Sequence, residues 1–274
     1  MSSSGPDLRF DGKVAVVTGA AGGLGSAISR AFAANGASLV LVDINADGLD
    51  ALASTLDAPT LCLTANVTDQ ETVAQLPGAV LDRFGRVDIL VNNAGGNRRL
   101  LPHEVTPDHW DAMINLNLRS AFLMSQAFGL EMIGQRAGNI VNISSTCGIS
   151  GMGRGNFVFS LAKAALNHMT KELALEWGSS GIRVNGILPA QVQNGAFAMD
   201  AWKSWIDSEG SVMADKIVRG TPLGRAINPD DIAGPVLFLA SDASAMVTGT
   251  LIAVDGGSLA VNRVGTVGQP IVVG

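Results

Sequence analysis

Seven short apolar runs, separated by longer segments with a helical pattern, constrain the fold of this chain more than any other feature. The runs are Val14–Val17, Leu39–Val42, Leu61–Leu63, Ile89–Val91, Ile140–Ile143, Val184–Leu188 and Leu251–Val254. Because they are apolar at consecutive positions, they predict strands buried on both faces, as in a parallel sheet. Helices should cover both sides of it, among them residues 26–35, 107–126, 160–177 and 230–240. The sequence therefore predicts an α/β, doubly wound, seven-stranded parallel sheet.

Length and charge limit the class of protein further. A chain of 274 residues without a linker fits one domain, residues 1–274. A net charge of −6 argues against nucleic acid as a partner. The polar start, Met1–Lys13, is not a secretory signal, and no apolar stretch approaches the ~18 residues of a membrane span, so we expect a cytoplasmic protein without a membrane partner.

The few cysteines and histidines predict neither a disulfide framework nor a metal site. Only Cys62 and Cys147 occur, one in an apolar run and one after Ser145. His103, His109 and His168 lack the spacing of metal ligands, and solvated imidazoles explain them better.

A glycine-rich segment follows the first predicted strand and opens the first predicted helix. It carries Gly19, Gly23, Leu24 and Gly25. Small residues at this turn let the backbone approach a pyrophosphate, and N–H groups at the helix start carry partial positive charge. Asp43 ends the second strand 18 residues beyond Gly25 (43 − 25), close to the offset at which an acidic residue meets the adenosine ribose. The two features together predict a dinucleotide site.

Three further motifs follow in order: Asn66-Val67, Asn92-Asn93-Ala94-Gly95 and Val254-Asp255-Gly256-Gly257. With the glycine-rich loop they resemble the short-chain dehydrogenase/reductase family over roughly residues 8–257. The resemblance implies a Rossmann fold that binds NAD. The cofactor-binding residues it implies beyond the loop and Asp43 are Asn66, Val67, Asn93, Ala94, Gly95, Lys163, Pro189, Val192 and Asn194.

The same resemblance places a catalytic tetrad on Asn117, Ser145, position 159 and Lys163, with the neighbours Asn115 and Ser144 ranked lower. The family has Tyr at position 159, but here the residue is Phe159, and the sequence contains no Tyr. In a helix, positions 159 and 163 share a face, so the Lys163 ammonium would favour a phenolate there. Family members use that hydroxyl to move the proton that accompanies hydride transfer. We therefore expect a chain that binds its cofactor and is nearly inactive.

An ordinary explanation of Phe159 is also open: it could be a core aromatic residue, with the family motif aligned to the wrong position. The other nearby aromatic is Phe157, which has no acidic proton either. Either register leaves the site without its hydroxyl. Because Phe and Tyr have nearly the same volume, a Tyr-to-Phe replacement in an intact site is the better interpretation.

Three arginines are candidates for contact with the substrate, together with Ser145. Arg98 and Arg99 follow Gly95 closely, and Arg154 precedes Phe159. Planar guanidiniums suit carboxylate, sulfonate or phosphate. The segment resembles sugar-acid dehydrogenases of the gluconate 5-dehydrogenase type, whereas a solvated loop or an interface salt bridge would explain a single arginine equally well.

The segment after the sixth strand departs from the family pattern, with Ala190 and Asn194 where Gly and Thr are common. The Asn side chain can still bond an amide. Residues 191–224 resemble a mobile substrate lid, for which a packed amphipathic helix pair is the ordinary alternative. The tail, residues 258–274, and helices at 107–126 and 160–177 imply a homo-oligomer, a tetramer or dimer.

Together these features predict an NAD-dependent dehydrogenase acting on a secondary alcohol of a sugar, sugar acid or related polyol, impaired by Phe159. One alternative is a non-catalytic NAD-binding regulatory protein. Another is an NADPH-dependent reductase of ketone or acyl substrates. The latter conflicts with Asp43, which would repel a 2′-phosphate, and with the lack of a basic residue in the glycine-rich loop.

Overall fold

The computed structural model describes residues 8–192 and 219–260. Its centre is one seven-stranded sheet in the order β3-β2-β1-β4-β5-β6-β7, with every neighbouring pair parallel. The strands are β1 Val14–Thr18, β2 Ser38–Asp43, β3 Thr60–Thr64, β4 Ile89–Asn92, β5 Gly138–Ile143, β6 Ile182–Pro189 and β7 Leu251–Val254. All seven predicted strands are confirmed, each within two residues of its expected bounds.

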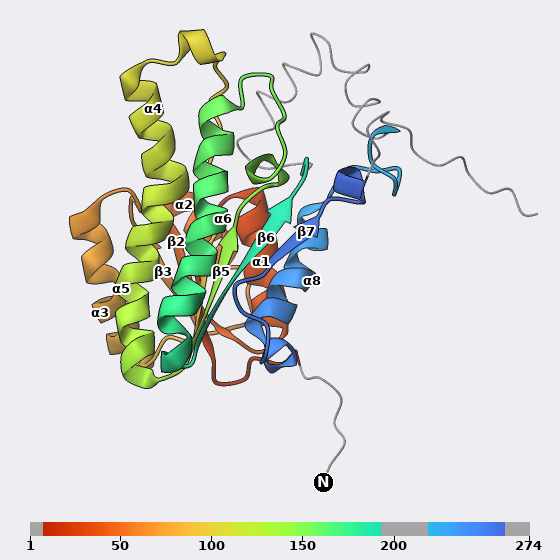
Figure 1. Ribbon diagram of the computed structural model, residues 1–274. Coiled ribbons are helices and arrows are strands. Elements are labelled where there is room, and N and C mark those ends of the chain that lie inside the picture. Colours follow the sequence, from red (N-terminus) through yellow and green to blue (C-terminus); the bar gives the residue numbers. More distant parts are fainter. Residues whose placement is uncertain (1–7, 193–218, 261–274) are drawn as a thin grey trace, which may run out of the picture.

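Helices cover both faces of the sheet (Figure 1). They are α1 Gly23–Ala34, α2 Ala46–Ala53, α3 Gln70–Phe84, α4 Pro107–Ile114, α5 Ser120–Gln135, α6 Phe157–Trp177 and α8 Pro229–Ala240. Short 3-10 turns lie at Pro102–Glu104, Thr146–Gly148, Gly178–Ser180, Asp242–Ser244 and Ser258–Ala260. The doubly wound fold is thereby confirmed.

Alternate residues of the strands point into two separate cores. On β1, Ala15 and Val17 pack with residues of α1, α2 and α8, whereas Val14 and Val16 pack with residues of α3 and α5. Apolar side chains at consecutive positions are therefore required, because each strand has no polar face.

The predicted helix at 107–126 is interrupted. A π-helical turn, Asn115–Arg119, separates α4 from α5. The side chain of Asn117 donates from Nδ2 to the Met113 carbonyl (3.0 Å) and to the Gly96 carbonyl (2.8 Å). Such π turns inside helices often occur at functional sites, and this one turns Asn117 toward the end of β4.

Two features of the described residues concern membranes and assembly. None of the helices in this part of the chain combines the length and the low charge that crossing a bilayer requires. Apolar side chains are exposed on α5 (Phe122, Leu130) and α6 (Leu161, Leu175). The homo-oligomer expected from the resemblance stays a prediction.

Candidate active site

The glycine-rich loop and the turn after β4 are tied together where the strand order reverses, between β1 and β4. The Thr18 hydroxyl accepts the N–H groups of Asn93 and Ala94, both at 3.0 Å. Asn93 donates from Nδ2 to the carbonyls of Thr18 (2.8 Å) and Gly19 (3.1 Å). In open α/β sheets ligands bind in the crevice at this reversal, and these bonds hold its two walls together.

Two glycines allow α1 to begin against the loop. Gly19 has a φ of +64°, which favours glycine, and a Cβ on Gly25 would lie 2.1 Å from the Gly19 carbonyl oxygen. The first turn of α1 holds no acidic residue, and its N-cap, Gly22, makes no side-chain capping bond. Backbone N–H groups at the helix start are therefore free for an anion such as a pyrophosphate.

Asp43 lies beside this loop at the end of β2. Its Oδ2 accepts the Ala21 N–H and its Oδ1 accepts the Asn45 N–H, both at 3.0 Å. On the neighbouring strand, β3, the chain continues into exposed Asn66 and buried Val67. The structure thus places the residues expected to bind the adenosine at adjacent strand ends.

Asn117 and Lys163 meet at Gly95. A Cβ on Gly95 would lie 3.0 Å from Asn117 Oδ1 and 3.6 Å from Lys163 Nζ. Lys163 is 5% exposed and donates from Nζ to the Ile143 carbonyl (2.8 Å). Burial lowers the pKa of Lys163 to about 8, against an opposing contribution from Cys147. The ammonium thus stands between the ends of β4 and β5, where the resemblance implies the nicotinamide ribose.

Phe159 faces this lysine. Lys163 Nζ lies 5.7 Å from the centre of the Phe159 ring, a cation–π distance. Phe159 is half-buried, whereas Phe157 is exposed and packs against Trp110 with ring centres 6.4 Å apart. Phe159 rather than Phe157 therefore occupies the tyrosine position of the tetrad, because of these two rings only that of Phe159 lies over the Lys163 ammonium.

Ser145 lies at the end of β5, opposite the end of β6. Its hydroxyl accepts the Cys147 N–H (3.2 Å) and donates weakly to the Pro189 carbonyl (3.4 Å). The Thr146 hydroxyl donates to the same carbonyl at 3.4 Å. A substrate oxygen can draw the Ser145 hydroxyl away while Thr146 keeps the carbonyl bonded. Ser144 instead donates to the Lys163 carbonyl (3.2 Å), which fits its lower rank.

The arginine candidates lie on two loops that are fastened to each other. Asn97 donates from Nδ2 to Asn156 Oδ1 (2.6 Å), and the Leu100 N–H donates to the Gly155 carbonyl (3.2 Å). Arg98, Arg99 and Arg154 are all exposed, and Arg154 has a φ of +55°. The structure therefore gathers the segments that carry the three guanidiniums, while their contact with a substrate stays a prediction.

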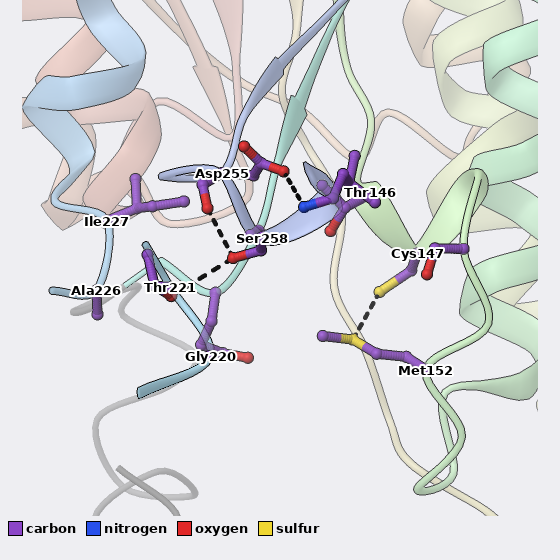
Figure 2. Close-up of a pocket in the computed structure, with 13 residues that line it drawn as sticks. Thr146, Cys147, Met152, Gly220, Thr221, Ala226, Ile227, Asp255 and Ser258 are labelled. Carbon is purple, nitrogen blue, oxygen red and sulfur yellow. Dashed lines mark hydrogen bonds between the residues drawn. The ribbon is translucent and has the colours of Figure 1, made fainter. Parts of the chain in front are cut away.

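Beyond Ser145 lies a cavity of about 250 Å³. The loops after β5, β6 and β7 and the segment before α8 contribute its walls (Figure 2). Gln191 and Thr221 belong to the predicted lid, residues 191–224, whereas Ala226 and Ile227 were not predicted to line the site. The Val254-Asp255-Gly256-Gly257 motif brings Asp255 to this cavity from the end of β7.

Several predicted features fall outside the described residues. Asn194 and most of the predicted lid, 191–224, belong to this part, as do residues 261–274 of the predicted tail. Pro189 is buried at the end of β6, and Val192 forms an isolated parallel bridge with Ile227. Cys62 and Cys147 are free thiols, and the described residues contain no cluster of metal-binding side chains.

The comparisons with known proteins agree with the fold. A family model described as enoyl-(acyl carrier protein) reductase matches residues 19–258. D-threitol dehydrogenase of Mycolicibacterium smegmatis is 39% identical over 254 residues, which are 92% of this chain and 94% of the relative. This chain belongs to the short-chain dehydrogenase/reductase family.

Two solved structures of this family extend the comparison. NAD⁺-bound xylitol dehydrogenase superposes with a TM-score of 0.85 at 28% identity, covering 91% of this chain and all of the other. A protein from Beutenbergia cavernae, described as an NAD(P)-dependent gluconate 5-dehydrogenase with bound NADP, gives 0.84 at 33% identity, covering 93% and 99%. The family members thus use nicotinamide cofactors, in both the NAD and the NADP form.

The depressed pKa of Lys163 predicts a specific pH dependence of stability. Because the folded-state pKa of about 8 lies below the ordinary value of 10.5, the unfolded state binds more protons between these values, and stability rises with pH across that window. We expect Lys163→Met to remove this rise and to stabilise the fold at pH 7 by on the order of 3 kcal/mol.

Urea denaturation at pH 7 to 10 measures the effect, with Lys171→Met, an exposed position on α6, as the control. Unfolding free energies that run parallel in all three proteins would show that Lys163 is charged and well solvated.

Proposed function

We propose that this short-chain dehydrogenase binds NAD and has a site shaped for oxidising a secondary alcohol of a polyol or sugar, but lacks the hydroxyl that takes the alcohol proton. The observation that carries the proposal is the Phe159 ring over Lys163 Nζ. The other three residues of the tetrad, Asn117, Ser145 and Lys163, have polar side chains that are held by hydrogen bonds. Relatives named for threitol and xylitol support the substrate class.

The residues present fit a bound NAD. The close packing of the Gly19 carbonyl on Gly25 and the free N–H groups of α1 suit a pyrophosphate, and Asp43 lies where a ribose would bind. NAD⁺ supplies the acceptor for the hydride that leaves the alcohol carbon. Lys163 would bind the adjoining ribose, as the resemblance implies.

The chain's own residues then account for only part of the reaction. Ser145 would donate a hydrogen bond to the substrate oxygen and orient the carbon that loses the hydride. The alcohol proton needs an acceptor at position 159, and the Phe159 ring has no acidic or basic atom. Lys163 cannot replace it directly while it donates to the Ile143 carbonyl at 2.8 Å. Oxidation therefore stops at the proton transfer.

Two further candidates remain. The first is a non-catalytic NAD-binding regulatory protein, which Phe159 would also explain. The Phe159→Tyr protein distinguishes this from an impaired dehydrogenase, because the site of a regulatory protein has no reason to gain turnover. Sugar-acid substrates are favoured by a different observation, the two arginine-bearing loops that are bonded to each other beside the site. The carboxylate of such a substrate would then bind at these arginine-bearing loops, which form the rim of the site.

The carboxylate of Asp43 predicts the cofactor preference. We expect NAD(H) to bind at least tenfold more tightly than NADP(H), about 1.4 kcal/mol, because the carboxylate bonds ribose hydroxyls and repels a phosphate. Calorimetry with both cofactors measures this.

Two variants test the assignment. Asp43→Asn should reduce the difference in affinity between NAD(H) and NADP(H), whereas Asp50→Asn, which removes an exposed carboxylate of α2, should leave this difference unchanged. Equal affinities of the unmodified chain for both cofactors would refute the role of Asp43.

A further inference from the structure

The cavity beyond Ser145 is lined by residues that directly follow Ser145 and Pro189 in the chain. Its lining begins with Thr146 and Cys147, which follow Ser145 in sequence, and with Ala190, which follows Pro189. Because the Ser145 hydroxyl bonds the Pro189 carbonyl, the serine stands at the boundary between these two walls. A substrate held by Ser145 can therefore extend into the cavity.

The size of the cavity limits what can enter it. About 250 Å³ holds about eight waters at ~30 Å³ each, and lies below the roughly 300 to 1,000 Å³ of pockets for drug-sized ligands. This is room for a polyol of a few carbons.

The walls alternate between apolar and hydrogen-bonding groups. Met152, Ile227 and Ala226 supply apolar surface, and the Cys147 thiol donates to the Met152 sulfur at 3.2 Å (Figure 2). Gln191 lines the same space; its main-chain carbonyl accepts the Ile227 N–H (3.3 Å), and its side-chain amide makes no hydrogen bond to any residue that the structure describes. A chain of CHOH units offers both C–H surface and hydroxyls, which matches such walls.

The charge of the lining selects against an anion. The lining contributed by described residues includes the Asp255 carboxylate, 9% exposed, and no Lys or Arg. Asp255 accepts the N–H groups of Gly257 (2.9 Å) and Leu259 (2.8 Å). A second carboxylate in this confined space would be desolvated, unpaired and repelled.

We propose that this cavity is the subsite for the uncharged, hydroxylated end of the substrate, and that it excludes a carboxylate at that end. The inference rests on the proposed function and narrows it. A neutral polyol of four to six carbons would place its reacting carbon at Ser145 and its remaining hydroxyls against Gln191. Any acidic group would have to lie at the opposite end, on the side of the arginine-bearing loops.

The experiment is an equilibrium titration of the unmodified chain, saturated with NAD⁺, with glycerol, threitol, xylitol, galactitol and galactonate. Absorbance of NADH is followed in parallel to record any turnover. We expect affinity to rise with chain length, galactitol binding at least tenfold more tightly than glycerol, and galactonate binding at least tenfold more weakly than galactitol.

Three variants locate the effect. Ala226→Leu narrows the cavity and should weaken galactitol binding at least tenfold while glycerol changes less than threefold. Gln191→Leu removes one hydrogen-bonding group and should weaken galactitol about five- to tenfold, which provides a test even if the first variant does not fold. Gln75→Leu, an exposed residue of α3, is the control and should match the unmodified chain.

The outcomes separate the two proposals. If polyols bind with no dependence on length, or if both cavity variants bind every polyol as the control does, the subsite is refuted and the proposed function stands. If galactonate binds as tightly as galactitol and Arg98→Ala removes that affinity, the arginine-bearing loops bind the carboxylate. The proposal that the substrate's carboxylate is excluded is then wrong. If NAD⁺ binds but no polyol does, the proposed substrate class falls, and the subsite with it.

Discussion

Replacing Phe159 by Tyr is expected to raise the rate of NAD⁺ reduction with a polyol about 10²- to 10⁴-fold, the usual contribution of a general acid–base group. The ring already lies 5.7 Å from Lys163 Nζ, so the new hydroxyl needs no rearrangement of the helix. The ammonium beside it favours the phenolate, which accepts the alcohol proton. Initial rates at saturating NAD⁺, measured on the same polyols for both proteins, give the ratio.

Phe157→Tyr is the matched control. It adds the same hydroxyl two residues away on α6, where the ring is exposed and contacts Trp110 instead of Lys163. No gain is expected from it. If the unmodified chain turned over as fast as Phe159→Tyr, or if Phe157→Tyr gave the larger gain, the placement of the proton-transfer position would be wrong.

The second large effect is expected for Gly25→Ala. The added Cβ would lie 2.1 Å from the Gly19 carbonyl oxygen and 2.9 Å from Ala20 Cα, so the backbone of the loop has to move. Overpacking of this kind costs about 1–3 kcal/mol in stability. Because the displaced loop is also the proposed pyrophosphate site, NADH affinity should fall about 10- to 150-fold.

Gly78→Ala provides the comparison for this variant. Gly78 lies inside α3 with no atom within 4 Å of the added Cβ, and Ala is the better helix former, so stability should hold or rise. Thermal unfolding and NADH titration of both variants measure the two effects. An unchanged NADH affinity in Gly25→Ala would mean that the cofactor does not approach this loop.

The sequence predicted the fold well because the sheet is buried on both faces. Each strand must then be apolar at consecutive positions, and this pattern identified all seven strands. The π turn at Asn115–Arg119 was not predicted; within it Asn117 bonds the Gly96 carbonyl, a partner 21 residues away in sequence. Local patterns contain no information on such contacts.

Part of the candidate site could likewise be predicted from the sequence, and part could not. Phe159 and Lys163 were predictable as neighbours from helical spacing alone. The cavity was not, because Thr146, Gln191, Ala226 and Asp255 come from four separate segments that meet only in the folded chain. The role of the arginines stays a prediction, since a cation on an exposed loop fits solvent as well as a substrate.

The central claim is that a complete dinucleotide site coexists with an interrupted proton path. The most direct test is a calorimetric titration of the unmodified chain and of Phe159→Tyr with NADH. Because the hydroxyl at residue 159 serves proton transfer and not cofactor binding, the two affinities should agree within about threefold, less than 0.7 kcal/mol. An unmodified chain that binds no NADH, while Phe159→Tyr does, would contradict the account.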